Sequence, residues 1–119
     1  MFDYSPTHNP DLWVLLRLTN AKTSEDVYKI LAGWHGGWCS EEWKLSSGVV
    51  PSQVIENGNQ YESRQVSGTN YVLHKSGEGL NGIMRDALRG WQKMAESDPD
   101  ITIEVVSGEA TFNTMMGKA

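Results

Sequence analysis

The stretch "LWVLLRLT", residues 12–19, contains the longest apolar run of the chain, and its conformation decides the fold. The preceding Asn9-Pro10-Asp11 is typical of a helix start, with a cap residue followed by proline at the first helical position. The run itself is short, contains a tryptophan and a valine, and is followed at once by a sequence of stronger helical character. We therefore predict a β-strand over 12–19 that is buried on both faces.

The next segment, "TSEDVYKILAGW", predicts a helix over 25–32. Ser24 is a suitable N-cap, and the two acidic residues that follow favour the positive end of the helix dipole. Gly33 is a plausible stop. One apolar stripe is formed by Val27, Ile30 and Leu31.

The middle of the chain predicts an antiparallel meander. Two turn signals, Asn57-Gly58 and Gly68-Thr69, are typical of tight hairpins, and Pro51 separates the first two strands. The alternation at the start of the meander directs Trp43 into the core. The predicted strands lie near 43–50, 53–56, 60–67 and 70–75.

A helix over 79–96 has the clearest period in the sequence. Its opposite face carries a cationic row, Arg85, Arg89 and Lys93. A final strand is expected over 101–107. The apolar stripe of the helix comprises Leu80, Ile83, Met84, Ala87, Leu88, Trp91, Met94 and Ala95.

Together these elements predict one α+β domain over 1–119. An antiparallel sheet, made of a meander of about four strands plus N- and C-terminal strands, is packed by one long and one short helix. Residues 1–10 and 108–119 are expected to be flexible arms.

Composition narrows the class of protein. The formal net charge of -5 disfavours a protein that coats nucleic acid. Cys39 is the only cysteine, which excludes an intramolecular disulfide and fits a reducing cytoplasm. The first ten residues lack the pattern of a secretory signal, and no apolar run is long enough to span a bilayer. We expect a cytoplasmic protein without a membrane partner.

Residues 32–48, "AGWHGGWCSEEWKLSSG", gather three tryptophans, a histidine and the cysteine. A nucleophilic Cys39 would need His35 beside it, and the glycines between them disfavour the helix that would align the two. Trp34 is expected to close the core. Trp38, on a glycine-flanked loop, either folds back onto the core or is offered to a partner.

Neither a metal nor a cofactor is predicted. A zinc site needs four ligands in paired sets, and the three histidines, at 8, 35 and 74, are scattered. The glycines at 77, 79 and 82 match G-x-G-x-x-G, but they follow a meander rather than a βαβ unit. A helix-capping loop explains them better, although the helix start with Lys75 nearby suits an anion.

The segments "VYKILAGWHGGW…WKLSSGVV" and "VSGTNYVLHKSGEGLNG" resemble a family of small proteins from tailed phages and prophages. The family pattern is A-G-W-x-G-G, then W-[KR]-x-x-S-G-[IV], then S-G-x-x-Y-x-x-H-K, and the resemblance spans about 13–95. The chain departs from it at Gly77-Glu78-Gly79, where the family has a tyrosine-glycine step, and in its C-terminal strand and tail. The resemblance implies a cytoplasmic accessory protein and no catalytic residue.

The leading functional prediction is a non-enzymatic module that binds a host or phage protein. The candidate surface is Trp34, His35, Trp38, His74 and Lys75. One alternative is nucleic-acid binding through Arg85, Arg89 and Lys93. The other is a cysteine- and histidine-dependent enzyme that uses Cys39 and His35.

Overall fold

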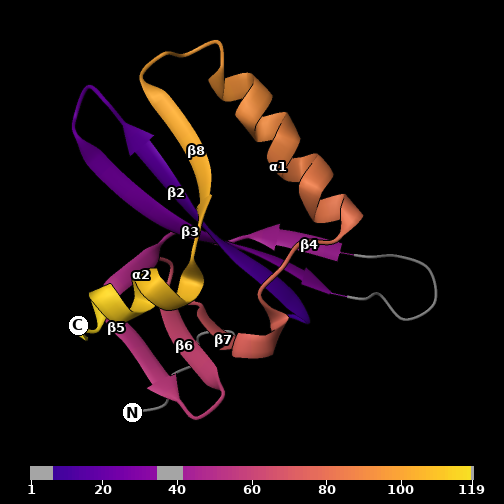
Figure 1. Ribbon diagram of the computed structural model, residues 1–119, viewed down its shortest axis with the longest axis vertical. Coiled ribbons are helices and arrows are strands. Elements are labelled where there is room, and N and C mark those ends of the chain that lie inside the picture. Colours follow the sequence, from indigo (N-terminus) through magenta and orange to yellow (C-terminus); the bar gives the residue numbers. More distant parts are fainter. Residues whose placement is uncertain (1–6, 35–41, 119) are drawn as a thin grey trace.

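The computed structural model describes residues 7–34 and 42–118, and it confirms an α+β fold with mostly antiparallel sheets (Figure 1). The first sheet has the strand order β4-β3-β2-β8, and the second has the order β1-β7-β6-β5. The elements are β1 (Thr7–His8), β2 (Leu12–Asn20), β3 (Glu25–Trp34), β4 (Glu42–Leu45), β5 (Val49–Asn57), β6 (Gln60–Gln65), β7 (Asn70–His74), the 3₁₀ turn η1 (Lys75–Gly77), α1 (Gly82–Ala95), β8 (Ile101–Val106) and α2 (Gly108–Met115).

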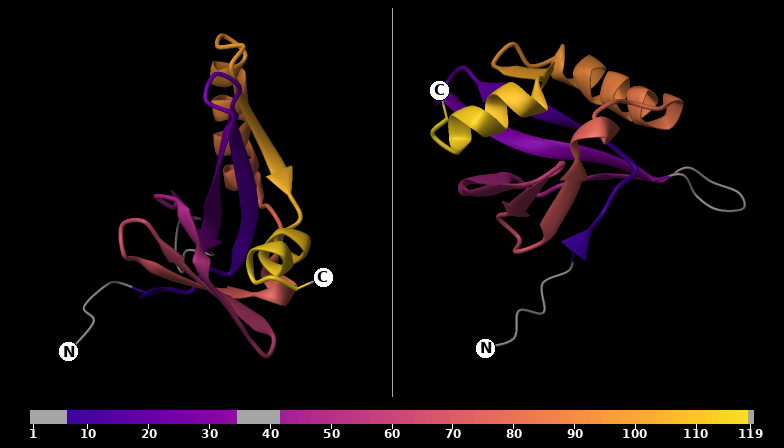
Figure 2. Two further views of the ribbon diagram at one scale, coloured as in Figure 1. Left: turned by 90° about the vertical axis from the view of Figure 1, so that its left-hand side faces the viewer. Right: turned by 60° about the horizontal axis from the view of Figure 1, so that its bottom comes forward.

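The molecule is layered around the first sheet, with α1 on one face and the second sheet and α2 on the other (Figure 2). β2 lies inside this sheet and is buried on both faces, as predicted. Trp13 and Leu15 contribute to the core between the sheets, whereas Val14 and Leu16 pack toward α1. Alternating side chains of one apolar strand therefore supply two separate cores.

The predicted helix over 25–32 is wrong, because this segment is strand β3. It pairs with β2 in a continuous antiparallel register from Leu12↔Gly33 to Asn20↔Glu25. Ile30 enters the core between the sheets and Leu31 the core under α1. Because both faces are covered, adjacent apolar residues are both buried, and the sequence imitates a helical stripe.

The meander is shorter than predicted. Only β5, β6 and β7 form it, while β4 joins the first sheet beside β3. Pro51 lies inside β5, within a register shift between Val49 and Val54, so two predicted strands are one. The first hairpin pairs Asn57 with Gln60, and Gly58 adopts a positive φ of 61° at the turn. The two residues of the turn are therefore Gly58 and Asn59, one residue later than the predicted pair Asn57-Gly58.

Both predicted arms contain ordered structure. The C-terminal segment forms α2, whose Phe112 is completely buried between Trp13 and Tyr61. At the other end, β1 pairs in parallel with β7, and Pro10 is buried. The expectation of flexible arms is therefore wrong for 7–10 and 108–118. The prolines and polar residues of 1–10 indicated an arm, but burial of Pro10 at one end and of the Phe112 ring at the other attaches these segments to the core.

Candidate functional site

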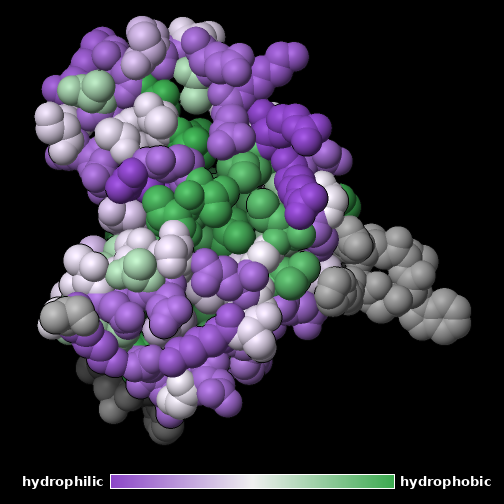
Figure 3. Space-filling model, viewed as in Figure 1, coloured by the Kyte–Doolittle hydropathy of each residue, from purple (hydrophilic) through white to green (hydrophobic). Residues whose placement is uncertain are grey.

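An apolar groove of about 340 Å³ lies between the C-terminal half of α1 and the first sheet. Figure 3 shows a contiguous hydrophobic area between α1 and β8, flanked by hydrophilic residues. Ligand sites are typically concave and mostly apolar, and this volume falls at the lower end of their range. The groove is lined by Leu16, Leu18, Leu45, Trp91, Met94, Ala95, Asp98, Ile101 and Ile103.

The packing of α1 explains where the groove opens. Near its start, Met84 is fully buried and touches β3 at Gly33, where a side chain on the strand would overlap the Met84 sulfur. Towards the other end, Trp91 is only partly buried and Met94 is 72% exposed. The apolar stripe of α1 is therefore longer than the surface that the sheet covers.

The side chains that line the groove are of the kind that binds an apolar ligand. Among the described residues that line it, Asp98 is the only charged one, and the other side chains are aliphatic, aromatic or the thioether of Met94. Shifted pKa values occur at His8, Arg17, Glu56, Tyr61, Tyr71 and Lys75, none of which lines the groove. Methionine adapts its shape to different apolar partners, which suits a surface that accepts an inserted side chain.

The cationic row of α1 lies away from this groove, because Arg85, Arg89 and Lys93 point to other sides of the helix than the lining residues Trp91, Met94 and Ala95. The side-chain amide of Gln92 donates to the backbone oxygen of Ile103 at 3.1 Å, so this side of α1 faces β8. Around the helix Arg85 lies close to Gln92, and Arg89 lies between Gln92 and Lys93. Both arginines are exposed, and neither forms an ion pair within residues 7–34 and 42–118. Lys93 lies further round, on the outer face of α1.

Trp43 extends the aromatic lining beyond the groove. Its ring contacts Trp91 in an edge-to-face arrangement, with centroids 5.1 Å apart and planes at 77°. Trp43 lies on the α1 side of the sheet beside Leu45, as the alternation predicted. It is nevertheless 42% exposed, so the expectation that it belongs to the core is wrong.

The predicted tryptophan surface comprises Trp34, His35, Trp38, His74 and Lys75, and two of these five residues lie outside the described part of the chain. His35, Trp38 and Cys39 lie there, and their predictions stay predictions. Trp34 is half-buried, and its indole N–H donates to the backbone oxygen of Asn9 at 3.2 Å. A second, more polar cavity of about 520 Å³ is lined by Thr7, His8, Asn9, Trp34, Trp43 and Lys44.

His8 connects the two sheets beside this second cavity. Its ring packs against Trp34 and Tyr71, with centroid distances of 5.8 and 5.2 Å. Burial lowers the pKa of His8, and the nearby Lys44 ammonium lowers it further. The ring therefore acts as a neutral packing group at neutral pH.

His74 and Lys75 lie at another corner of the molecule. The backbone oxygen of His74 accepts a hydrogen bond from the Trp13 indole at 2.7 Å. Lys75 pairs with Glu56, and its ammonium lies 5.1 Å from the centre of the Tyr61 ring. Trp34 and Lys75 thus have different neighbours.

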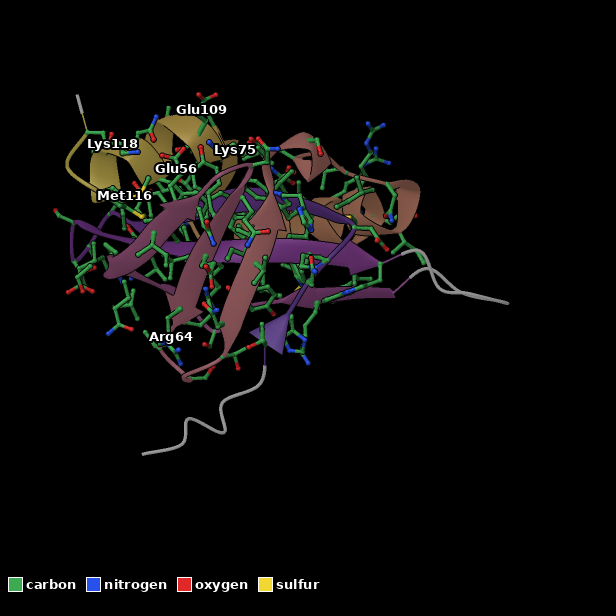
Figure 4. The ribbon with its side chains drawn as sticks, turned by 90° about the horizontal axis from the view of Figure 1, so that it is seen from below. Glu56, Arg64, Lys75, Glu109, Met116 and Lys118 are labelled. Carbon is green, nitrogen blue, oxygen red and sulfur yellow. The ribbon has the colours of Figure 1, made fainter. Side chains whose placement is uncertain are left out.

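Glu56 holds this corner together. It accepts hydrogen bonds from Lys118 and Lys75, which lower the pKa of its carboxyl from 4.5 to about 2. Figure 4 shows the three side chains gathered beside α2, with Arg64 at the far end of the second sheet. These ion pairs attach the C-terminal segment to the second sheet, so Lys75 and Lys118 already have a structural role.

The glycine-rich loop before α1 also has a structural role. A side chain at Gly77 would lie 2.7 Å from the backbone oxygen of Asp11, and Gly79 donates its N–H to the backbone oxygen of Trp13. The Glu78 carboxylate accepts the N–H of Gly108 at 2.8 Å, at the start of α2. The loop therefore joins β2 to α2, and Asn81 caps α1 through the N–H of Met84.

Sequence reasoning missed the groove as a site. The apolar stripe of the helix and a strand over 101–107 were predicted, but neither was connected with a site. The signal that could have indicated the groove was the width of the apolar stripe. The stripe includes Met94, which lies beyond the part of the helix surface that one sheet can cover. The tilt of the helix on the sheet decides which of these residues are exposed, and no local pattern encodes it.

Comparison with family models, with curated proteins and with solved structures found no match for the chain. In the described ranges, no group of acidic, histidine or cysteine residues is arranged to hold a metal ion. Neither α1 nor α2 is long and apolar enough to cross a membrane.

Proposed function

We propose that the protein is a non-enzymatic binding module that receives an apolar segment of a protein partner in the groove between α1 and the first sheet. The observation that carries this proposal is the concentration at one concave place of apolar side chains that are half-buried or, at Met94, exposed. Apolar patches on a monomer surface, rimmed by polar residues, are typical of interaction sites. Grooves beside a helix accept apolar side chains of partner segments.

The resemblance to small phage and prophage proteins supplies the proposed context. In that setting the module is a cytoplasmic accessory protein, and its partner is a host or phage protein. The tryptophan surface that includes Trp38 is a second place where such a partner would touch the protein.

A pull-down that compares a groove-blocking variant with a matched control tests the proposal. Ala95→Trp places an indole inside the groove, whereas Lys93→Trp adds the same side chain on the outer face of α1. Both tagged variants and the wild type are incubated with nuclease-treated bacterial lysate, and the retained proteins are identified by mass spectrometry. We expect a protein that the wild type and Lys93→Trp retain and that Ala95→Trp loses.

Circular dichroism of the two variants controls for folding. A retained protein that binds all three forms equally would contradict the groove as the binding site. If that protein were lost on Trp38→Ala instead, the tryptophan surface would replace the groove in the proposal.

Nucleic-acid binding is the second candidate, because Arg85, Arg89 and Lys93 are exposed and form no ion pair with described residues. Binding of this kind weakens steeply as salt rises. A gel shift at low salt that disappears at physiological salt, and that Arg89→Glu removes, would favour this candidate. Absence of a shift at low salt would remove it.

A further inference from the structure

We propose that the partner segment binds in an extended conformation, as an additional strand along the free edge of β8, and that every second side chain of it enters the groove. This inference rests on the proposed function and specifies how the segment is recognised. An edge strand presents a row of backbone donors and acceptors, and the addition of a strand to such an edge is a recurring mode of peptide recognition.

The first step is the direction of the backbone groups of β8. This strand is the last of its sheet and pairs with β2 on one side. The N–H of Ala21 donates to the backbone oxygen of Asp100 at 2.8 Å, so the even-numbered residues of the antiparallel pair direct their backbone groups towards β2. The residues whose N–H and C=O groups point outwards are the odd-numbered ones, Ile101, Ile103 and Val105.

Most of these outward groups are open to a partner. The N–H of Ile101 donates to the backbone oxygen of Asp98, and Gln92 donates to that of Ile103. The N–H of Ile103 and both backbone groups of Val105 form no hydrogen bond in the part of the chain that the structure describes. Gln92 is exposed, so its amide returns to water when a partner N–H takes the Ile103 oxygen, and one hydrogen bond replaces another.

Among the sheet edges of the described ranges, that of β8 is the least protected. β1 has two residues and β4 has four, so neither offers a long edge. β5 contains Pro51 and a register shift, and α2 packs against it. Proteins protect their edges by short strands, prolines and bulges. β8 has six residues, no proline and a continuous register with β2, so none of these protections applies to it.

The same edge forms one side of the groove. Ile101 and Ile103 line the groove, and its apolar surface is open between β8 and α1 (Figure 3). Side chains alternate between the two faces of a strand, and neighbouring strands lie about 4.8 Å apart. Every second side chain of an added strand therefore lies beside those of Ile101 and Ile103, on the face where Met94 also lines the groove. The occupant that fits is an extended segment with large apolar residues at alternate positions.

A segment of another protein is favoured over a second copy of this chain. The formal net charge of -5 makes two copies repel each other. Antiparallel pairing of two β8 strands about Glu104 would also place this carboxylate opposite its own copy, which disfavours that register. A neutral segment avoids both costs.

The test begins with a selection of random twelve-residue peptides displayed on phage, carried out on the whole chain with counter-selection on Ala95→Trp. We expect the enriched peptides to carry large apolar residues at alternate positions. If no peptide were enriched over the counter-selected background, both the inference and the proposed function would be overturned.

One enriched peptide is then synthesised as a series in which each backbone N–H in turn is replaced by an N-methyl group. Only alternate N–H groups of an added strand face β8, so the loss of affinity should alternate along the peptide. We expect a loss of roughly tenfold or more at every second position and of less than about twofold between them. Losses without this alternation would overturn the inference and leave the groove as the binding site.

Two variants test the edge from the side of the protein. Val105→Pro removes an outward N–H and no hydrogen bond to β2, and Val105→Thr keeps the N–H on a side chain of similar shape. Val105→Pro should weaken binding of the unmodified peptide by roughly tenfold, and Val105→Thr by less than about twofold. Equal binding by the two variants would overturn the inference.

Circular dichroism shows whether both variants fold, and the N-methyl series decides the question if Val105→Pro does not. Sedimentation of the wild type without peptide tests the other occupant. A monomer is expected. A dimer that Val105→Pro converts to a monomer would overturn the assignment of the β8 edge to a separate partner.

Discussion

Replacing Phe112 with alanine tests whether the C-terminal segment belongs to the core. The phenyl ring is 0% exposed, and its centroid lies 5.0 Å from that of Tyr61 and 5.9 Å from that of Trp13. Truncation of a buried phenylalanine costs about 3–5 kcal/mol, through lost burial and the cavity that remains. A single domain has a total stability of about 5–15 kcal/mol, so Phe112→Ala should remove a large fraction of it.

Urea denaturation followed by tryptophan fluorescence and circular dichroism measures this loss. For a domain of this size, about 3–5 kcal/mol corresponds to a lowering of Tm by roughly 10–20 °C. Val66→Ala is the control, because Val66 is 69% exposed and its truncation should change stability by less than about 0.5 kcal/mol. A change of that small size for Phe112→Ala would refute the packing of α2 against Trp13 and Tyr61.

Two further predictions concern the attachment of the same segment. Because ion pairs lower the pKa of Glu56 from 4.5 to about 2, its stabilising contribution is complete above about 4.5 and is lost as the pH falls to about 2. Glu56→Gln should therefore lower Tm at neutral pH, and the difference from wild type should vanish near pH 2; a constant difference in thermal scans across this range would contradict the cause. Gly108→Ala should destabilise by about 1–3 kcal/mol, because its methyl group would overlap the Trp13 indole. Gly82→Ala, where a methyl group meets nothing within 4 Å, is the matched control in urea denaturation, and equal stability of the two variants would contradict the close packing.

The groove illustrates how far the sequence leads towards a site. The apolar stripe of α1 predicted a helix that packs on a sheet, and Arg85, Arg89 and Lys93 were correctly placed away from that contact. Which sides of the helix stay exposed depends on the edge of the sheet that the helix follows. The Gln92–Ile103 hydrogen bond, between residues of two different elements, carries that information.

By itself, the sequence determined those elements whose own pattern matches their final surroundings. Residues 12–19 are apolar at nearly every position and became a strand buried on both faces, and the 3.6-residue period of α1 gave a helix with one buried face. Long-range pairing decided the rest. Residues 25–34 carry an apolar pattern that suits a helix or a fully covered strand, and the register with β2 selects the strand. Residues 108–115 have little periodicity, and the burial of Phe112 against Trp13, distant in sequence, orders them. A local sequence pattern reflects the conformational preference of its own segment. Burial on several sides depends instead on which other segments of the chain pack against it.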